Sequence, residues 1–260
     1  MYLILIAKFL LGVASPDKTV DVPFQAGEVI RYKLNYGWFS IGNGVVTLTD
    51  SLANSKRYFY VNARASSSGF LNLFAKVNDE WGALVHVNDL LPVLTFRNIR
   101  EGRYFLREEV WLDQHAGEIL VKSVKPHRTP SIRPDKHFAF DPEVDMYDFL
   151  SGLLKLRSLQ LSELKLGDSI RMQGFFEDTF YDFQIAYQGL KTIKTKMGKL
   201  EAHELQPVVP KNSTFDGEQS ITAWFSNDSL QLPVKVAAKM FLGKVSCEIV
   251  GYERLNPRVN

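Results

Sequence analysis

The chain has 260 residues, of which 45% are hydrophobic and 23% charged. This composition provides ample apolar material for a core and excludes a disordered protein. The net charge is +2 and no run of five like charges occurs, so a nucleic-acid partner or an anionic-membrane footprint has no support. The single cysteine, Cys247, excludes an intramolecular disulfide and a cysteine-based zinc site.

The N-terminus, "MYLILIAKFLLGVASPDK", is an apolar run that ends in small residues. It is shorter than the roughly 20 residues of a membrane-spanning helix and has the form of a secretory signal. No Lys or Arg precedes the run, and Lys8 interrupts it. Residues 1–15 are therefore predicted as a signal peptide with a truncated start; a buried N-terminal element is the alternative. We expect the mature chain, residues 16–260, to lack a transmembrane segment and to be periplasmic or otherwise exported to the bacterial envelope.

Alternating apolar and polar residues, the pattern of half-buried strands, dominate the chain. The first runs are "VIRYKLNY" (29–36), "GVVTLTD" (44–50) and "RYFYVNARAS" (57–66). The "GNG" at 42–44 is expected to form the first hairpin turn. About fourteen such runs predict a mainly β fold, a curved antiparallel sheet forming a partly closed barrel or a sandwich.

Helical spacing replaces this alternation once, after Pro142, where apolar residues fall at Met146, Phe149, Leu150, Leu153 and Leu154. The acid–Pro–acid start at 141–143 suits a helix N-terminus, which predicts one long helix near 142–160.

A second, shorter helix is predicted over 68–76. The long helix separates two β-rich halves, about 22–140 and 160–255, which we expect to form one domain; two domains are the alternative.

Motifs for catalysis and metal binding were sought along the whole chain. No Gly-x-Ser-x-Gly elbow is present, and the five histidines form no i+2 or i+4 pair. Asp141, Glu143 and Asp145 have the spacing of a calcium loop but lack its Gly and its final Glu. We therefore expect no catalytic residues, no metal and no cofactor, and a protein that is not an enzyme.

Aromatic residues are abundant, with 18 Phe and 10 Tyr. They are interpreted first as a filled core; the alternative is that some line a cavity for an apolar ligand within the curved sheet. The lining predicted for such a cavity comes from the first hairpin and the two helical stretches: Trp38, Phe39, Phe70, Leu73, Phe74, Tyr147, Phe149, Leu150, Leu153 and Leu154.

The stretch "WFSNDSLQLPVKV" (224–236) contains an acid, Asp228, in a polar loop between apolar runs. Ser, Asn and Asp side chains hydrogen-bond their own backbone in turns, and Pro233 suits a strand start. No His or Lys lies within the loop, so the segment is predicted to be a structural hairpin turn and not a catalytic loop.

Five segments together resemble one bacterial family, the domain of unknown function 3108. They are "FQAGEVIRYKLNYG", "DLLPVLTFRNIREGRY", "DMYDFLSGLLKLRSL", "TKMGKLEAHELQPVV" and "AWFSNDSLQLPVKV", in that order over residues 22–255. The resemblance implies an exported, largely β protein and supplies no catalytic residues. The last segment also resembles the C-terminal hairpins of LolA- and LolB-like lipoprotein carriers, which implies a curved sheet that holds acyl chains around a helix.

Three functions remain open from the sequence. The first is an exported, non-enzymatic binder of a lipophilic or amphiphilic ligand. The second is a structural or protein-interaction module in envelope assembly, with an envelope protein as partner at exposed strand edges. The third is an enzyme, which would require Asp182, His203 or Glu204 to cluster in one polar cleft.

Overall fold

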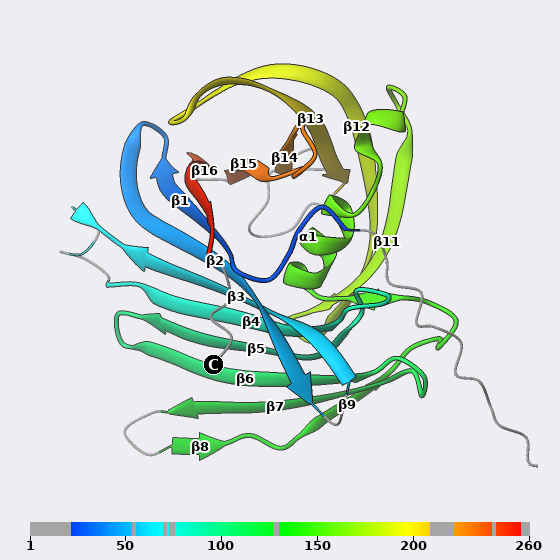
Figure 1. The fold of residues 1–260 in the computed structure, drawn as a ribbon. Helices are drawn as coiled ribbons and strands as arrows, with labels where there is room; N and C mark the ends of the chain where they lie inside the picture. Colours follow the sequence, from blue (N-terminus) through cyan, green and yellow to red (C-terminus); the bar gives the residue numbers. More distant parts are fainter. Residues whose placement is uncertain are drawn as a thin grey trace, which may run out of the picture.

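The computed structural model describes residues 22–53, 56–69, 72, 76–126, 130–208, 221–240 and 243–255. The expected signal peptide, residues 1–15, lies outside this part of the chain. Within it, one continuous sheet curls around a single α-helix, which Figure 1 shows inside the ring of strands. The mainly β fold expected from the alternating pattern is confirmed.

Strands from both sides of the helix belong to this sheet. In chain order the elements are β1 (Glu28–Tyr36), β2 (Phe39–Ala53), β3 (Lys56–Ser67), β4 (Asn78–His86), β5 (Pro92–Glu101), β6 (Tyr104–Asp113), β7 (Glu118–Pro126), β8 (Pro130–Ile132), β9 (Lys136–Ala139), β10 (Met146–Tyr147), α1 (Phe149–Arg157), a 3-10 turn η2 (Leu161–Glu163), β11 (Ser169–Phe176), β12 (Thr179–Thr195), β13 (Gly198–Val208), β14 (Ile221–Ser226), β15 (Pro233–Met240) and β16 (Gly243–Arg254).

The strand order is that of a chain folded into a ring whose two ends do not pair. It runs from β10 through β11 to β16, then to β1 and on to β8, with β9 beside β7. All pairs are antiparallel except β10 with β11. The first and last long strands are neighbours, since β1 pairs with β16 along its whole length. The sheet is therefore barrel-like but not closed.

Side chains close the gap between the two ends of the sheet. Phe138 of β9 packs on Phe175 and Phe180 of the β11–β12 hairpin, with ring centroids 5.0 and 6.2 Å away. Lys136 forms an ion pair with Asp178 beside this aromatic cluster. Aromatic packing and charge pairing thus replace a backbone ladder at this seam.

The hairpin of β12 and β13 is long and strongly bent, and in Figure 1 it arches over the ring. The pairing of the two strands shifts register between Tyr187 and Leu190, where Gly189 has φ 86°. Such a bulge bends a strand and increases its twist. Beyond the bend, Ile193 and Leu200 pack against the core cluster that contains Ile30 and Ile249.

The predicted helix is confirmed, but it begins at Phe149 and not at Pro142. Asp148 is the N-cap: its carboxylate accepts hydrogen bonds from Leu150 N and Ser151 N, and Ser151 Oγ accepts one from Asp148 N. Asp141, the expected cap, instead closes a turn with Glu143 N. The later start leaves Met146 and Tyr147 to pair with β11 as strand β10.

The expected hairpin turn at "GNG" is wrong. Gly42 and Gly44 lie inside β2, and the chain reverses earlier, at Gly37 and Trp38. A Cβ atom on Gly42 would lie 2.5 Å from the carbonyl oxygen of Ser66. Glycine is therefore required there by the close approach of β3 and not by a turn. The shorter helix expected at 68–76 falls largely on residues outside the described part.

Candidate functional site

A cavity of about 310 Å³ lies under the arching β12–β13 hairpin, on the inner side of the sheet. Its floor is buried and apolar: Leu232, Val234 and Ile249 are 7%, 3% and 1% exposed. Met197, at the hairpin turn, is 56% exposed and stands at the mouth. The complete lining comprises Met197, Leu200, Glu201, Ser226, Asn227, Asp228, Leu232, Val234 and Ile249.

The polar part of this lining comes from the loop after β14, the turn predicted from its Ser, Asn and Asp residues. The turn is confirmed, since Asp228 Oδ1 accepts hydrogen bonds from Ser226 Oγ, Leu230 N and Gln231 N at 2.8, 2.9 and 3.1 Å. The same carboxylate lines the cavity. The lining holds two acids, Glu201 and Asp228, and no basic residue. The rim thus presents acceptors and negative charge to whatever occupies the apolar space.

A buried histidine supports the rim. His203 is 4% exposed, and its Nε2 lies 3.0 Å from Asn227 Oδ1 while its Nδ1 lies 2.8 Å from the Tyr187 hydroxyl. Asn227 directs its amide nitrogen to Glu201 Oε2, so its oxygen faces the ring, which assigns the proton to Nε2. Burial lowers the pKa of His203, although its bond with Asn227 opposes this. The ring is therefore neutral and accepts from Tyr187.

The loop is also fastened to the end of the helix. Gln231 Nε2 donates to the carbonyl oxygens of Arg157 and Leu159 at 2.6 and 2.8 Å, and Arg157 donates to Leu230 O at 3.0 Å. Arg157 is itself buried in an ion pair with Glu28 of β1, 2.9 Å apart. One wall of the cavity is therefore held to the helix and to the first strand.

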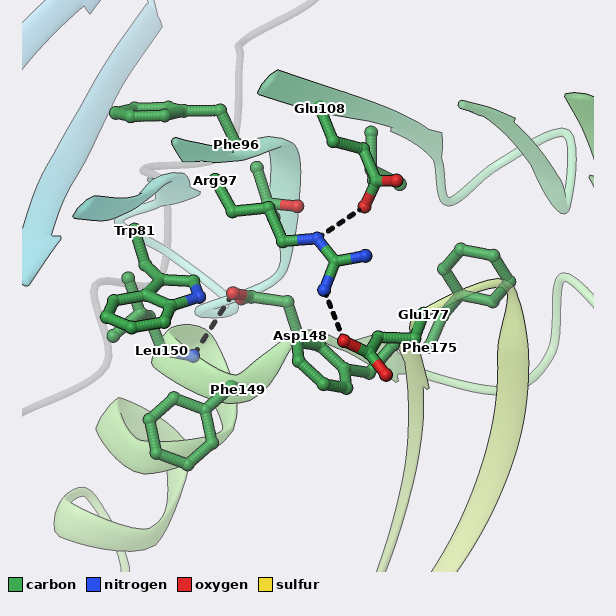
Figure 2. A pocket seen from close by; sticks show the side chains of 12 residues that line it. Trp81, Phe96, Arg97, Glu108, Asp148, Phe149, Leu150, Phe175 and Glu177 are labelled. Carbon is green, nitrogen blue, oxygen red and sulfur yellow. Dashed lines mark hydrogen bonds and ion pairs between the residues drawn. The ribbon is translucent and has the colours of Figure 1, made fainter. Parts of the chain in front are cut away.

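A second, much smaller hollow lies at the other end of the helix (Figure 2). Its volume is about 30 Å³, which is room for one water molecule. Arg97 lies over the Phe176 ring and bonds Glu108 and Glu177 at 2.7 and 2.5 Å. With its charges paired and so little space, this hollow fits a structural junction between β5, β6 and the β11–β12 turn, not a ligand site.

Asp148 stands in the same small hollow as the helix cap. Loss of solvation raises the pKa of its carboxyl, although the hydrogen bonds from Ser151 and Leu150 oppose that rise. Its oxygens are occupied by these backbone bonds, so the raised pKa reflects the capping role and not acid–base chemistry.

The structure describes seven of the ten predicted lining residues and places them in three different environments. Trp38 and Phe39 project from the β1–β2 turn, 96% and 71% exposed. Tyr147, Leu150 and Leu154 are core residues, and Leu153 packs against the core. Phe149 is 67% exposed and, with Leu150, borders the small hollow.

Phe70, Leu73 and Phe74 lie outside the described residues. No residue of the predicted set borders the larger cavity. Its walls come from the β12–β13 turn, β13, the end of β14 with the loop after it, β15 and β16, where short apolar runs look like ordinary strand faces. The bend at Gly189 brings these walls together, and its only sign in the sequence is the glycine itself, which does not predict a cavity.

The three residues named for an enzyme have separate surroundings. Asp182 is exposed on β12, and His203 is buried against Tyr187 and Asn227. Glu204 accepts a hydrogen bond from Trp224 Nε1 at 2.8 Å, on the face of β13 opposite to His203. They do not share a cleft. In the described part of the chain, no group of three His, Cys, Asp or Glu residues could hold a metal ion.

Cys247, the lone cysteine, sits partly buried in the cluster below the cavity. Burial, with a smaller contribution from Glu248, raises the pKa of its thiol to about 12. The thiol therefore stays protonated and unreactive. Among the described residues, no helix has the length and apolar character to cross a bilayer.

A family model, "Protein of unknown function (DUF3108)", matches residues 31–250. The chain belongs to the DUF3108 family. The resemblance drawn from its five segments is thereby confirmed, whereas the similarity to LolA and LolB carriers still depends on one short motif. No curated protein matches the sequence.

Two solved structures are similar to this DUF3108 chain. A β-barrel-like protein of the domain of unknown function DUF1849, from Brucella abortus, aligns with a TM-score of 0.58 and 9% identity, over 88% of this chain and 98% of its own. A protein of YmcC-like fold from Bacteroides fragilis NCTC 9343 aligns with a TM-score of 0.37 and 5% identity, over 91% and 100%. The first similarity supports the barrel-like fold and nothing further.

Proposed function

We propose that this DUF3108 protein is an exported, non-enzymatic binding protein that holds a lipophilic or amphiphilic ligand in the cavity under the β12–β13 hairpin. The observation that carries the proposal is the cavity itself, about 310 Å³ with a buried apolar floor. This volume lies at the lower end of the range for small-molecule sites, about 300–1,000 Å³.

The rim suggests which amphiphiles fit. Glu201, Asp228 and the amide of Asn227 surround an apolar space without any basic residue. A ligand with an apolar body and a neutral or donor head would pair with these acceptors. An anionic head would meet like charge at this rim, and the repulsion would weaken its binding. We therefore propose a neutral or cationic head group.

Two fluorescent probes with the same aromatic body test the cavity. N-phenyl-1-naphthylamine is neutral, and 1-anilinonaphthalene-8-sulfonate adds one sulfonate. We expect the neutral probe to bind with enhanced fluorescence and the sulfonate to bind more weakly. Met197→Glu places a charge at the mouth of the cavity and should weaken the binding of the neutral probe at least about tenfold.

Leu190→Glu is the matched control, because Leu190 is 45% exposed on the same hairpin and does not line the cavity. Equal binding by both variants would place the probe elsewhere and contradict the proposal. Mass spectrometry of the native protein should find a co-eluting lipid or amphiphile. A defined protein partner with no bound lipid would support the envelope-assembly module instead.

A further inference from the structure

The turn between β1 and β2 exposes more aromatic surface than a monomeric protein needs. Trp38 is 96% exposed, Phe39 71% and Tyr36 40%. Burial of a large aromatic side chain is worth about 1.5–3 kcal/mol in general, so nothing in folding favours leaving two of them in water. An exposed aromatic cluster at a projecting turn indicates a surface that is covered in use.

The neighbouring hairpin supplies positive charge beside these aromatic residues. Gly37 N donates to Lys244 O at 2.8 Å, and the Tyr36 ring covers Gly243, so the starts of β16 and of the β1–β2 turn lie together. Lys239 and Lys244 are directly opposite each other in the β15–β16 pair, and both are exposed.

Lys33, on β1, lies three residues before Tyr36. Lys33 lies directly opposite Glu248 in the β1–β16 pair, so the unbalanced charge is that of Lys239 and Lys244, since residues 236–247 contain no Asp or Glu.

The pairing of Lys239 with Lys244 is itself informative. Like charges directly opposite each other on a sheet destabilise it, and no acid within either strand end offsets them. An anion that binds between them would relieve this repulsion. The charge at this end of the molecule is therefore complementary to a negatively charged partner.

We propose that the β1–β2 turn, with Lys239 and Lys244, docks the protein onto an anionic lipid bilayer. Tryptophan favours the membrane–water interface, and each lysine near an anionic surface adds attraction. A protein partner fits less well. Buried aromatic side chains contribute about 150–250 Å² each, so Trp38 and Phe39 fall well short of the roughly 800 Å² per partner of a stable interface.

Flotation with vesicles tests the proposal. The full chain and its variants, which all begin at the same residue, are mixed with two kinds of vesicle. One kind is phosphatidylcholine alone, and the other contains one quarter phosphatidylglycerol. We expect the double variant W38A/F39A to bind the anionic vesicles at least about tenfold more weakly than the unaltered chain. W111A is the matched control, since Trp111 is 46% exposed on β6, and it should bind normally.

Charge and depth are measured separately. K239Q/K244Q should weaken binding to anionic vesicles by about fivefold per lysine and leave binding to phosphatidylcholine unchanged. About 1 M salt should abolish the difference between the unaltered chain and K239Q/K244Q on anionic vesicles, because charges more than about 3 Å apart are then screened. Brominated lipids should quench the unaltered chain more than W38F, because only the former carries an inserted indole at the turn.

Three results would overturn the proposal. They are equal flotation of W38A/F39A and the unaltered chain, equal quenching of W38F, or a concentration-dependent dimer that W38A/F39A abolishes while vesicle binding persists. None of these measurements depends on the cavity, so the docking proposal and the ligand-binding proposal are tested independently of each other.

Discussion

His203 is held by two hydrogen bonds, and the one that its Nδ1 accepts from Tyr187 requires a neutral ring. Its Nδ1 accepts from Tyr187, and its Nε2 donates to Asn227 at the cavity rim. Protonation would place a second donor against the Tyr187 hydroxyl and a charge in a buried setting. The single residue therefore connects pH to the rim of the proposed binding site.

The sign of this pH effect follows from the lowered pKa of His203. Below the ordinary histidine value of about 6.5, the unfolded chain takes up the proton before the folded chain does. The contribution to stability is complete above that value and is lost as the pH falls toward the lower pKa of the folded state. We expect His203→Gln to flatten the fall of the urea midpoint between about pH 7.5 and 5.5.

The control is His115→Gln, since His115 is exposed in the β6–β7 turn. It should keep the pH dependence of the unaltered chain. A fall of the same steepness in His203→Gln would show that another group causes it.

At the scale of elements, the sequence predicted whether a segment is a strand or a helix better than it predicted the residues at which the segment begins and ends. The strands, the helix α1 and the β14–β15 hairpin follow from local patterns that the structure bears out. The helix start and the first turn do not, since Asp141 and Gly42 each had a local explanation that a longer-range contact replaced. Asp141 closes a turn before β10, and Gly42 makes room for β3.

Gly42 and Gly44 form a matched pair of substitutions within β2. A Cβ atom on Gly42 would lie 2.5 Å from Ser66 O, whereas one on Gly44 would lie 3.5 Å from Tyr32 Cβ, an ordinary contact. We expect Gly42→Ala to lower the free energy of unfolding by about 1–3 kcal/mol. Gly44→Ala should be neutral or stabilising by up to about 1 kcal/mol.

Chemical denaturation of both variants checks this difference. Equal midpoints for the two alanine variants would mean that β3 moves away at little cost. The close approach would then not be the reason for glycine at position 42.

At the scale of the whole molecule, the features that matter for function come from residues far apart in the chain. The cavity combines β13, β14, β15 and β16 with the turns between them, and the docking surface combines two hairpins about 200 residues apart in sequence. In the sequence the lysines are scattered, which gave no support to an anionic-membrane footprint. Lys239 and Lys244 come close to each other and to the β1–β2 turn only in the folded sheet. The periodicity of a single sequence does not show which distant strands come into contact, so neither site could be predicted from it.

The buried pair of Glu28 and Arg157 joins the parts of this ring. Arg157 and Glu28 are 3% and 1% exposed, and Glu28 also accepts from Tyr252 of β16 at 3.2 Å. Removing one partner leaves the other charge buried and unpaired, so Glu28→Gln should cost about 3–5 kcal/mol of unfolding free energy. The double change E28L/R157L should recover much of that loss.

Arg31 and Glu253, on the same two strands, are the comparison pair, since their side chains are 50% and 44% exposed. Arg31→Ala should cost less than about 1 kcal/mol. A similar loss in Arg31→Ala and Glu28→Gln by denaturant titration would contradict the special role of burial.

The pairing of β1 with β16 sets an order of events in biosynthesis. The ribosome releases β1 long before β16 exists, so one flank of β1 stays without its partner until β16 has been synthesised. Long-range pairing of this kind is slow, because the chain must close a loop of most of its length. A newly made chain thus keeps an open flank on β1 until β16 arrives, and during that time a strand of another chain can pair with it.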